Sequence, residues 1–337
     1  MADVSTRPTS TVSGQDANTA TSADLNAATA TKRDTTKGVK LLLVSVLLLG
    51  LNWPVMKMGV EYFSPLWMVG LRFLFSVPVI ALVIYAAHRR RPRLTRADVP
   101  VILGVGVLQF IVSMGLVTAA LQYVPAGTAS ILIYTTPLWL LVMDVVVFRQ
   151  RPPIFRVLLT LLSAAGCATI MLASGEPGQW TPLFVVLAAA LFWAMAIRLV
   201  SQHAWQGKVL DAVFWQFLVA GIGMTALALV FEGLPTASMT APRAIALLTF
   251  MGPVVTGIGF GMLIGAGKLL EPAKVALVST LTPLIGYLGS MILLDEPILP
   301  MVVGGGALML TALALGSLPK RQLKRLRKRL RKRHRAT

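Results

Sequence analysis

The stretch ALQYVPAGTASILIYTTPLW, residues 120–139, has a counterpart 146 positions further on, AGKLLEPAKVALVSTLTPLI, residues 266–285. This offset superposes Thr136-Pro137-Leu138 on Thr282-Pro283-Leu284 and Ala120 on Ala266. A second, weaker match needs another offset and sets Leu-Asn-Trp at 51–53 against Leu-Phe-Trp at 191–193. Identities are few, but both matches fall at corresponding positions of two halves of the chain. We interpret them as an internal repeat, the construction common in transporters.

The composition places this repeat in a membrane. Of the 337 residues, 56% are hydrophobic and 13% are charged, whereas a soluble domain carries about 25% charge. The net charge of +18 is concentrated in KRQLKRLRKRLRKRHR, residues 320–335. Apolar and basic residues are thus separated along the chain. This pattern excludes a soluble enzyme, a disordered protein and a simple nucleic-acid-binding domain, and it indicates a polytopic membrane protein.

Apolar segments long enough to cross a bilayer, which needs about 20 residues per helix, recur along the chain. We predict an all-α membrane protein of ten transmembrane helices whose connectors are too short for an extramembrane domain. The spans are residues 39–60, 65–87, 99–120, 125–147, 154–173, 181–199, 212–231, 244–266, 273–294 and 298–318.

The charges of the connectors predict the orientation of the spans. Basic residues gather before the first span, in every even-numbered connector and in the C-terminal tail, so both termini are expected in the cytoplasm. Span four ends beside Arg149 and Arg151, but span nine ends at Asp295 and Glu296. The same motif therefore lies in opposite orientations, which predicts two inverted five-helix repeats and favours alternating access.

The chain then divides into four parts. Residues 1–37 are predicted to be a disordered cytoplasmic extension, 38–174 the first repeat, 175–318 the second repeat, and 319–337 a basic cytoplasmic tail. In the tail, Leu323, Leu326 and Leu330 form one apolar stripe on a cationic helix. We expect the tail to contact anionic lipids of the bilayer and not nucleic acid, because it is tethered at the membrane and lacks interleaved aromatic residues.

These features together resemble the drug/metabolite transporter superfamily, and within it the EamA-type inner-membrane exporters, over roughly residues 38–318. The resemblance rests on the ordered motifs Asn52-Trp53, Lys57, Ser64-Pro65 to Arg72, Ala119–Pro137, Ala266–Pro283 and Asp295-Glu296-Pro297. It implies export or facilitated movement of small metabolites across a bacterial inner membrane. The chain departs from the family pattern after span four, where Arg-Gln-Arg-Pro replaces the frequent Gly-Glu.

Two sets of residues are candidates for the transport path. Pro137 and Pro283 lack an N–H, so they are expected to free the carbonyls of Ile133 and Ser279; they break the helices either for gating or as structural kinks. Polar and aromatic residues near these breaks are candidate substrate contacts, with packing as the alternative. They are Asn52, Trp53, Gln109, Tyr134, Thr135, Trp139, Trp193 and Tyr287.

Three charged residues lie more than two residues from either end of a predicted span: Lys57, Arg72 and Asp144. Lys57 and Arg72 either snorkel outward, with Lys57 paired to Glu61, or form a positive patch for a substrate carboxylate. Asp144 lies within reach of Arg151 and is the sole carboxylate candidate for proton coupling.

The sequence offers no catalytic residue, no metal site and no cofactor site, since Cys167 is alone and the histidines fall in connectors or the tail. The predicted function is transport of a small organic solute, uncharged or zwitterionic and partly apolar. The alternative is a non-transporting scaffold or lipid-binding protein that acts through the tail. The sequence leaves open the substrate's identity, the energy source and the oligomeric state.

Reporter fusions test the predicted orientation. We expect a reporter that is active only in the cytoplasm to be active at both ends of the chain, because the basic residues lie on one side of the membrane. Activity of a periplasm-specific reporter at the C-terminus would contradict the ten-span arrangement.

Overall fold

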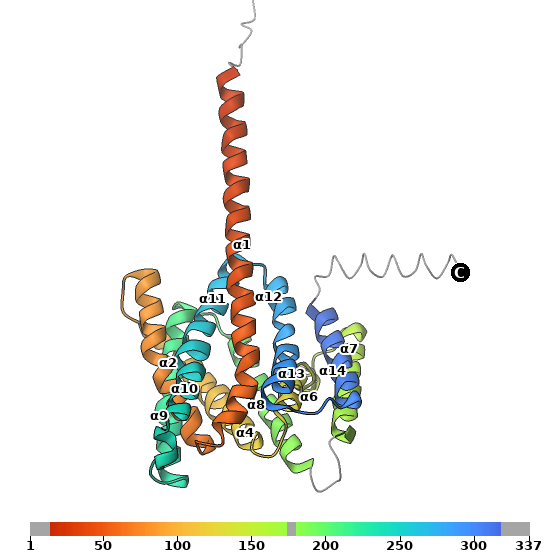
Figure 1. Cartoon of the computed structure of the whole chain (residues 1–337). Helices are drawn as coiled ribbons and strands as arrows, with labels where there is room; N and C mark the ends of the chain where they lie inside the picture. The colour runs from red at the N-terminus through yellow and green to blue at the C-terminus, as the bar shows by residue number, and fades with distance from the viewer. Residues whose placement is uncertain (1–13, 174–179, 318–337) are drawn as a thin grey trace, which may run out of the picture.

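The structure is a computed structural model that describes residues 14–173 and 180–317. Every regular element in these two ranges is a helix, and the helices form one bundle with the first helix projecting beyond one end (Figure 1). This agrees with the predicted all-α architecture.

The first half contains α1 (Gly14–Gly59), α2 (Pro65–His88), a third span, a fourth span and α7 (Ile154–Ala173). The third span consists of η1 (Arg96–Asp98), α3 (Val99–Val105), η2 (Gly106–Ser113) and α4 (Met114–Ala120). The fourth consists of α5 (Ala126–Leu132), η3 (Ile133–Thr135) and α6 (Thr136–Val146).

The second half contains α8 (Trp180–Gln202), α9 (Val209–Phe231), an eighth span, a ninth span and α14 (Pro300–Ser317). The eighth span follows η5 (Ala237–Thr240) and consists of α10 (Pro242–Thr249), η6 (Phe250–Gly259) and α11 (Phe260–Leu269). The ninth consists of α12 (Pro272–Ser279) and α13 (Leu281–Leu294).

The helix count fits the predicted ten spans. In the described ranges, nine helical stretches are long and apolar enough to cross a membrane, and Pro300–Gly316 is a shorter apolar helix at the place of the tenth predicted span. Each predicted span therefore has a helix in the structure.

The two halves pack according to a common plan. α2 packs on α9, its counterpart in the other half, and α7 packs on α14 in the same way. α1 packs on α13 of the ninth span, while α8 packs on α6 of the fourth span. Because each half crosses the bundle five times, equivalent helices of the halves run in opposite directions. These reciprocal contacts are those of an inverted repeat.

Irregular turns of helix also recur at equivalent positions. The π-helical segments η2 and η6 begin at Gly106 and Phe250, within two residues of the 146-residue offset. The fourth span tightens to a 3-10 turn at Ile133–Thr135, and the ninth is interrupted at Thr280 between α12 and α13. The interruptions of these two spans are thus part of the repeat.

The start of α1 differs from the sequence-based expectation. Residues 14–37 are helical and continuous with the first span, although the sequence predicts a disordered extension up to residue 37. The segment is rich in alanine, the best helix former, so a helix that starts in the membrane can continue through it. Residues 1–13 lie outside the described ranges.

Carboxylates tie helix ends across the two halves. The end of the bundle with Gly59 and Glu296 is called the Glu296 face, and the opposite end, with Arg90 and Leu270, the Arg90 face; the charge pattern predicts that the latter is cytoplasmic. Glu296 accepts hydrogen bonds from the backbone N–H groups of Ala126 (2.6 Å) and Gly127 (3.0 Å), at the start of α5.

Glu232 acts in the same way on α2. It accepts hydrogen bonds from the N–H groups of Leu66 (2.9 Å) and Trp67 (3.1 Å). On the Arg90 face, Asp98 accepts from the N–H groups of Gln206 (3.1 Å) and Gly207 (2.8 Å). Each carboxylate satisfies backbone groups that have no partner of their own within a helix.

Replacing Glu296 by alanine should lower stability. We expect Glu296→Ala to cost about 1–2 kcal/mol, because two N–H groups at the start of α5 lose their acceptor. The measurement is thermal unfolding of the purified protein in detergent. Glu271→Ala is the matched control, since Glu271 precedes α12 without making a side-chain cap hydrogen bond. Equal destabilisation by both substitutions would contradict the capping role.

Candidate functional site

Both interrupted spans resume at a turn that contains proline. Pro137 is the second residue of α6, and Pro283 is the third residue of α13. In the first turn of a helix a missing N–H costs no intrahelical hydrogen bond, so these prolines begin new helical segments. The carbonyl of Ile133, four residues before Pro137, accepts a hydrogen bond from the Thr136 hydroxyl (2.8 Å). The Thr136 hydroxyl thus supplies the hydrogen-bond donor that Pro137 lacks.

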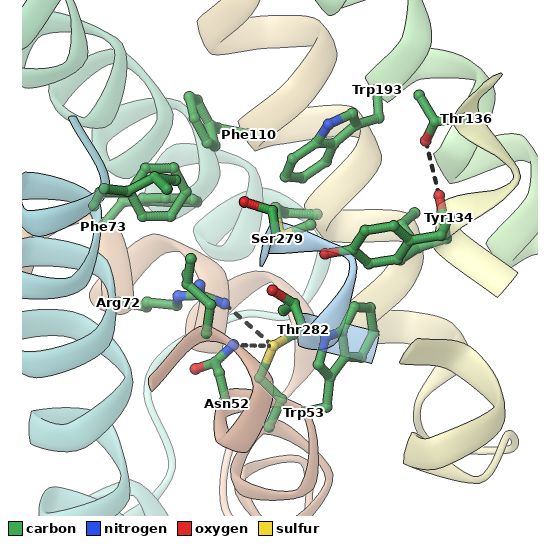
Figure 2. Close-up of a pocket in the computed structure, with 16 residues that line it drawn as sticks. Asn52, Trp53, Arg72, Phe73, Phe110, Tyr134, Thr136, Trp193, Ser279 and Thr282 are labelled. Atoms are coloured by element: carbon green, nitrogen blue, oxygen red, sulfur yellow. Dashed lines mark hydrogen bonds between the residues drawn. The ribbon is translucent and has the colours of Figure 1, made fainter. Parts of the chain in front are cut away.

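The two interruptions border one cavity of about 230 Å³. Ile133, Tyr134 and Thr136 reach it from the fourth span, and Ser279 and Thr282 reach it from the ninth. Other lining residues come from α1, α2, η2, α4, α8 and α11. Both halves of the repeat therefore contribute to the wall, and the cavity lies at the point where their broken helices meet (Figure 2).

Four of the eight predicted contact residues line this cavity: Asn52, Trp53, Tyr134 and Trp193. The hydroxyl of Tyr134 points toward Ser279 and Thr282 across the cavity (Figure 2). The Trp193 ring enters from α8, the counterpart of α1, which carries Trp53. The weaker of the two sequence matches thus leads to two tryptophans in one cavity.

The other four predicted residues are not among those that line the cavity: Gln109, Thr135, Trp139 and Tyr287. Thr135 is buried, and its hydroxyl donates to the carbonyl of Leu132 (2.9 Å). Tyr287 lies against Gly127, where α13 meets α5. Their proximity to the helix breaks in sequence does not decide on which side of the helix they lie.

Sequence reasoning missed an aromatic wall. Phe73, Phe110 and Phe260 line the cavity from α2, η2 and α11. Phe110 packs edge-to-face on Phe73 at 5.2 Å and on Phe260 at 6.3 Å between ring centroids. Phenylalanines are too common in apolar spans to be singled out, so no sequence signal distinguished these three. The wall gives the cavity a large apolar surface.

The three charged residues of the spans have different surroundings. Arg72 is buried and lines the cavity. Lys57 lies outside the lining; its ammonium donates to the carbonyls of Leu121 and Val124, the latter at 3.2 Å. These carbonyls follow the end of α4, where a positive charge is favourable. Lys57 thus ties α1 to the connector after α4, and its described hydrogen bonds go there instead of to Glu61.

Asp144 has partners other than the expected Arg151. Its carboxylate lies 2.6 Å from Arg156 and 3.4 Å from Arg198. The chain reverses after α6 through Arg149, which has a left-handed φ of 49°. This turn brings the first turn of α7 and its Arg156 beside Asp144, at the Arg90 face. The carboxylate is therefore committed to an ion-pair cluster away from the cavity lining.

The geometry of two reciprocal halves with a shared cavity agrees with the comparisons with known proteins. The EamA-like transporter family matches the chain twice, over residues 36–172 and 180–318. The chain belongs to this family. The family's name and those of the relatives below describe transporters, as the sequence motifs predict.

Two relatives and one solved structure illustrate the match. The chain is 30% identical over 290 residues to "Uncharacterized transporter YvbV" of Bacillus subtilis, covering 83% of this chain and 91% of the relative. It is 28% identical over 290 residues to a "Probable amino-acid metabolite efflux pump" of Salmonella typhimurium, covering 81% and 92%. A solved structure titled "Crystal structure of protein" matches with a TM-score of 0.51 at 16% identity, covering 84% of this chain and 94% of the solved one. This last likeness concerns the fold alone.

Alanine substitution of the two cavity tryptophans should impair transport by this EamA-like chain. We expect Trp53→Ala and Trp193→Ala each to reduce flux by about 10- to 100-fold, because a buried aromatic contact with the solute is lost. The measurement is solute uptake by proteoliposomes containing equal amounts of each variant. The control is Trp215→Ala, because Trp215 lies in α9 and is not a cavity-lining residue. Unchanged flux in both cavity variants would remove these rings from the site.

Proposed function

We propose that this chain exports a small, amphipathic, amino-acid-like solute by alternating access between its two halves. The observation that carries the proposal is the meeting of both broken spans at one cavity with tryptophan, tyrosine and phenylalanine in its wall. Interrupted helices at corresponding places in two repeats are typical of transporter substrate sites. Aromatic walls with a few polar groups suit a solute with an apolar body and a polar end.

The size of the cavity favours a metabolite over a drug-sized compound. Its volume of about 230 Å³ lies below the range of about 300–1,000 Å³ typical of pockets for drug-sized ligands. The name of the Salmonella typhimurium relative, a probable amino-acid metabolite efflux pump, supports both the solute class and the direction proposed here.

Unequal packing of the broken spans supports alternating access. Toward the Glu296 face, every residue of α5 is buried, and α5 packs on α13. The Ser130 hydroxyl lies 3.2 Å from the carbonyl oxygen of Pro283 at this crossing. Toward the Arg90 face, α12 has no buried residue, and Asp144 is the one buried residue of α6. We therefore assign this structure to a state closed on the Glu296 side, from which α5 and α13 must separate.

The same proposal includes the membrane in which the chain lies and its orientation there. It is a multi-pass membrane protein, and we propose a bacterial inner membrane with both termini and the Arg90 face in the cytoplasm. The two repeats then act as the moving bodies. The basic tail of residues 319–337 lies outside the described ranges, and we propose that it contacts anionic lipid headgroups.

Counterflow in proteoliposomes tests the proposed function. Vesicles containing the full-length chain are loaded in turn with unlabelled amino acids, nucleobases, sugars or toxic cations and supplied with the labelled form of the same compound. We expect exchange of amphipathic amino acids above that of protein-free vesicles. Absence of exchange for every compound would contradict transport of this solute range. A chain lacking residues 320–337 should still exchange; loss of exchange by a correctly inserted truncation would favour the scaffold alternative.

A reversible cross-link between α5 and α13 should stop transport. A Cβ atom on Gly286 would lie 2.9 Å from the Ser130 Cβ, and a disulfide joins Cβ atoms about 3.5–4.5 Å apart, so a slight separation of the helices accommodates it. We expect Ser130→Cys/Gly286→Cys, with Cys167→Ala, to lose flux on oxidation and regain it on reduction. Each single cysteine variant is the control. Undiminished flux in the oxidised double variant would contradict separation of these helices.

A further inference from the structure

Arg72 is a buried charge without an acidic partner among the described residues. Its exposed fraction is 5%, and it lines the cavity between the two halves. Its polar contacts in those residues are with Thr256 and with the sulfur of Met56. A buried arginine inside a membrane span is costly unless something neutralises it, so such a residue marks a functional site.

Two other buried charged side chains, Asp144 and Asp211, form ion pairs within the bundle. Asp144 at the Arg90 face is paired with Arg156 and Arg198. Asp211 is paired with Arg90 at 2.7 Å. Asp144 and Asp211 thus have protein partners of opposite sign, whereas Arg72 faces a cavity.

A short hydrogen-bond chain fixes the orientation of the Arg72 guanidinium. Its Nε–H donates to the Thr256 hydroxyl (2.7 Å), and that hydroxyl donates to the carbonyl of Met251 (2.7 Å). Thr256 and Met251 both belong to the π-helical segment η6, whose wider turn sets this carbonyl five residues before the hydroxyl. The Nη groups are left for other partners, and Nη1 has only the weak acceptor Met56 Sδ at 3.2 Å.

Asn52 supplies the complementary group. Its side-chain amide donates to the same sulfur, Met56 Sδ, at 2.9 Å. Its Oδ1 is buried and has no hydrogen-bond partner in the part of the chain that the structure describes, and the whole residue is 5% exposed and lines the cavity. A buried hydrogen-bond acceptor without a partner is costly, so we expect this oxygen to accept a hydrogen bond from a bound solute. In Figure 2, Asn52 and Arg72 lie on one side of the cavity and Tyr134 and Trp193 on the other.

We infer that Arg72 and Asn52 form the polar end of the substrate site, with Arg72 binding a carboxylate and Asn52 Oδ1 accepting a hydrogen bond from an ammonium group. A guanidinium fork matches the two oxygens of a carboxylate, which also neutralises its charge. The apolar part of the solute then lies against the aromatic residues opposite. This inference rests on the proposed function and deepens it: the substrate class is an α-amino acid with an apolar side chain, bound as a zwitterion.

The test combines changes in the solute with changes in the protein. The full-length chain in proteoliposomes exchanges labelled L-phenylalanine, and three unlabelled compounds compete: L-phenylalanine, L-phenylalaninamide, which lacks the carboxylate, and 3-phenylpropionate, which lacks the ammonium. For the wild-type chain we expect each missing group to weaken competition by about 10- to 100-fold, because a charge-assisted hydrogen bond is lost.

Arg72→Gln and Asn52→Leu should each abolish the preference for one charged group of the solute, the carboxylate or the ammonium. In the Arg72→Gln variant, unlabelled phenylalanine and its amide should compete nearly equally, and 3-phenylpropionate should still compete more weakly than phenylalanine. In the Asn52→Leu variant, phenylalanine and 3-phenylpropionate should compete nearly equally, and the amide should still compete more weakly. The Arg72→Lys variant should keep part of the preference for the carboxylate. Arg243→Gln is the matched control, because Arg243 also lies near a methionine sulfur, Met58 Sδ at 3.9 Å, but is exposed. It should behave as the wild type.

The outcomes separate this inference from the function on which it rests. Equal competition by phenylalanine and its amide in the wild-type chain would overturn the role of Arg72 without requiring any variant. Uniform loss of affinity for all three compounds in Arg72→Gln would identify a purely structural tie between α2 and η6. Exchange of a nucleobase or sugar but of no amino acid would overturn the inference and leave transport standing. Exchange of no compound would overturn both.

Discussion

Within a membrane, every backbone N–H and C=O group must find its hydrogen-bond partner inside the protein, and the arrangement of this bundle depends on that requirement. Continuous helices meet it by themselves. The fourth and ninth spans do not, because each is interrupted before a proline. A hydroxyl repairs part of the loss in the fourth span, where Thr136 donates to the Ile133 carbonyl. Such interruptions are tolerated at a cavity or against protein, and both of them border the same cavity.

The same requirement links the two halves at their ends. Helix N-termini present N–H groups without intrahelical partners, and acidic side chains from the opposite half accept them. Glu232 and Glu296 of the second half reach α2 and α5 of the first, while Asp98 of the first half reaches the connector before α9. These contacts are polar and few, whereas the packing between the halves along their length, such as that of α2 on α9 and of α7 on α14, is largely apolar. In the proposed alternating-access mechanism, these polar contacts would be broken and remade as the halves move.

In the state proposed above, closed on the Glu296 side, the two halves pack unequally, and their sequences differ at the crossing of the broken spans. At the crossing on the Glu296 side, Ser130 meets Gly286, and a Cβ on that glycine would already collide with Ser130. The 146-residue offset places Ala276 and Leu140 at the equivalent positions on the Arg90 side. A glycine and a serine allow the helix backbones to approach closely, whereas a leucine keeps them apart. The small residues at this crossing therefore support the proposed closure on the Glu296 side.

The sequence by itself determined the membrane class, the helical spans, the two repeats and their opposite orientation, because hydropathy, connector charge and repeated motifs are local or one-dimensional signals. It also singled out four residues that line the cavity, because the repeats point to the broken helices and their aromatic neighbours. These residues are Asn52, Trp53, Tyr134 and Trp193. Only the tertiary structure decided that Gln109, Thr135, Trp139 and Tyr287 lie outside the cavity lining, that Lys57 caps α4, and that Asp144 pairs with Arg156 and Arg198. It likewise decided that Arg72 faces the cavity without an acidic partner among the described residues. The physical reason is that the side of a helix a residue occupies, and the residues opposite it, depend on contacts between spans far apart in the chain.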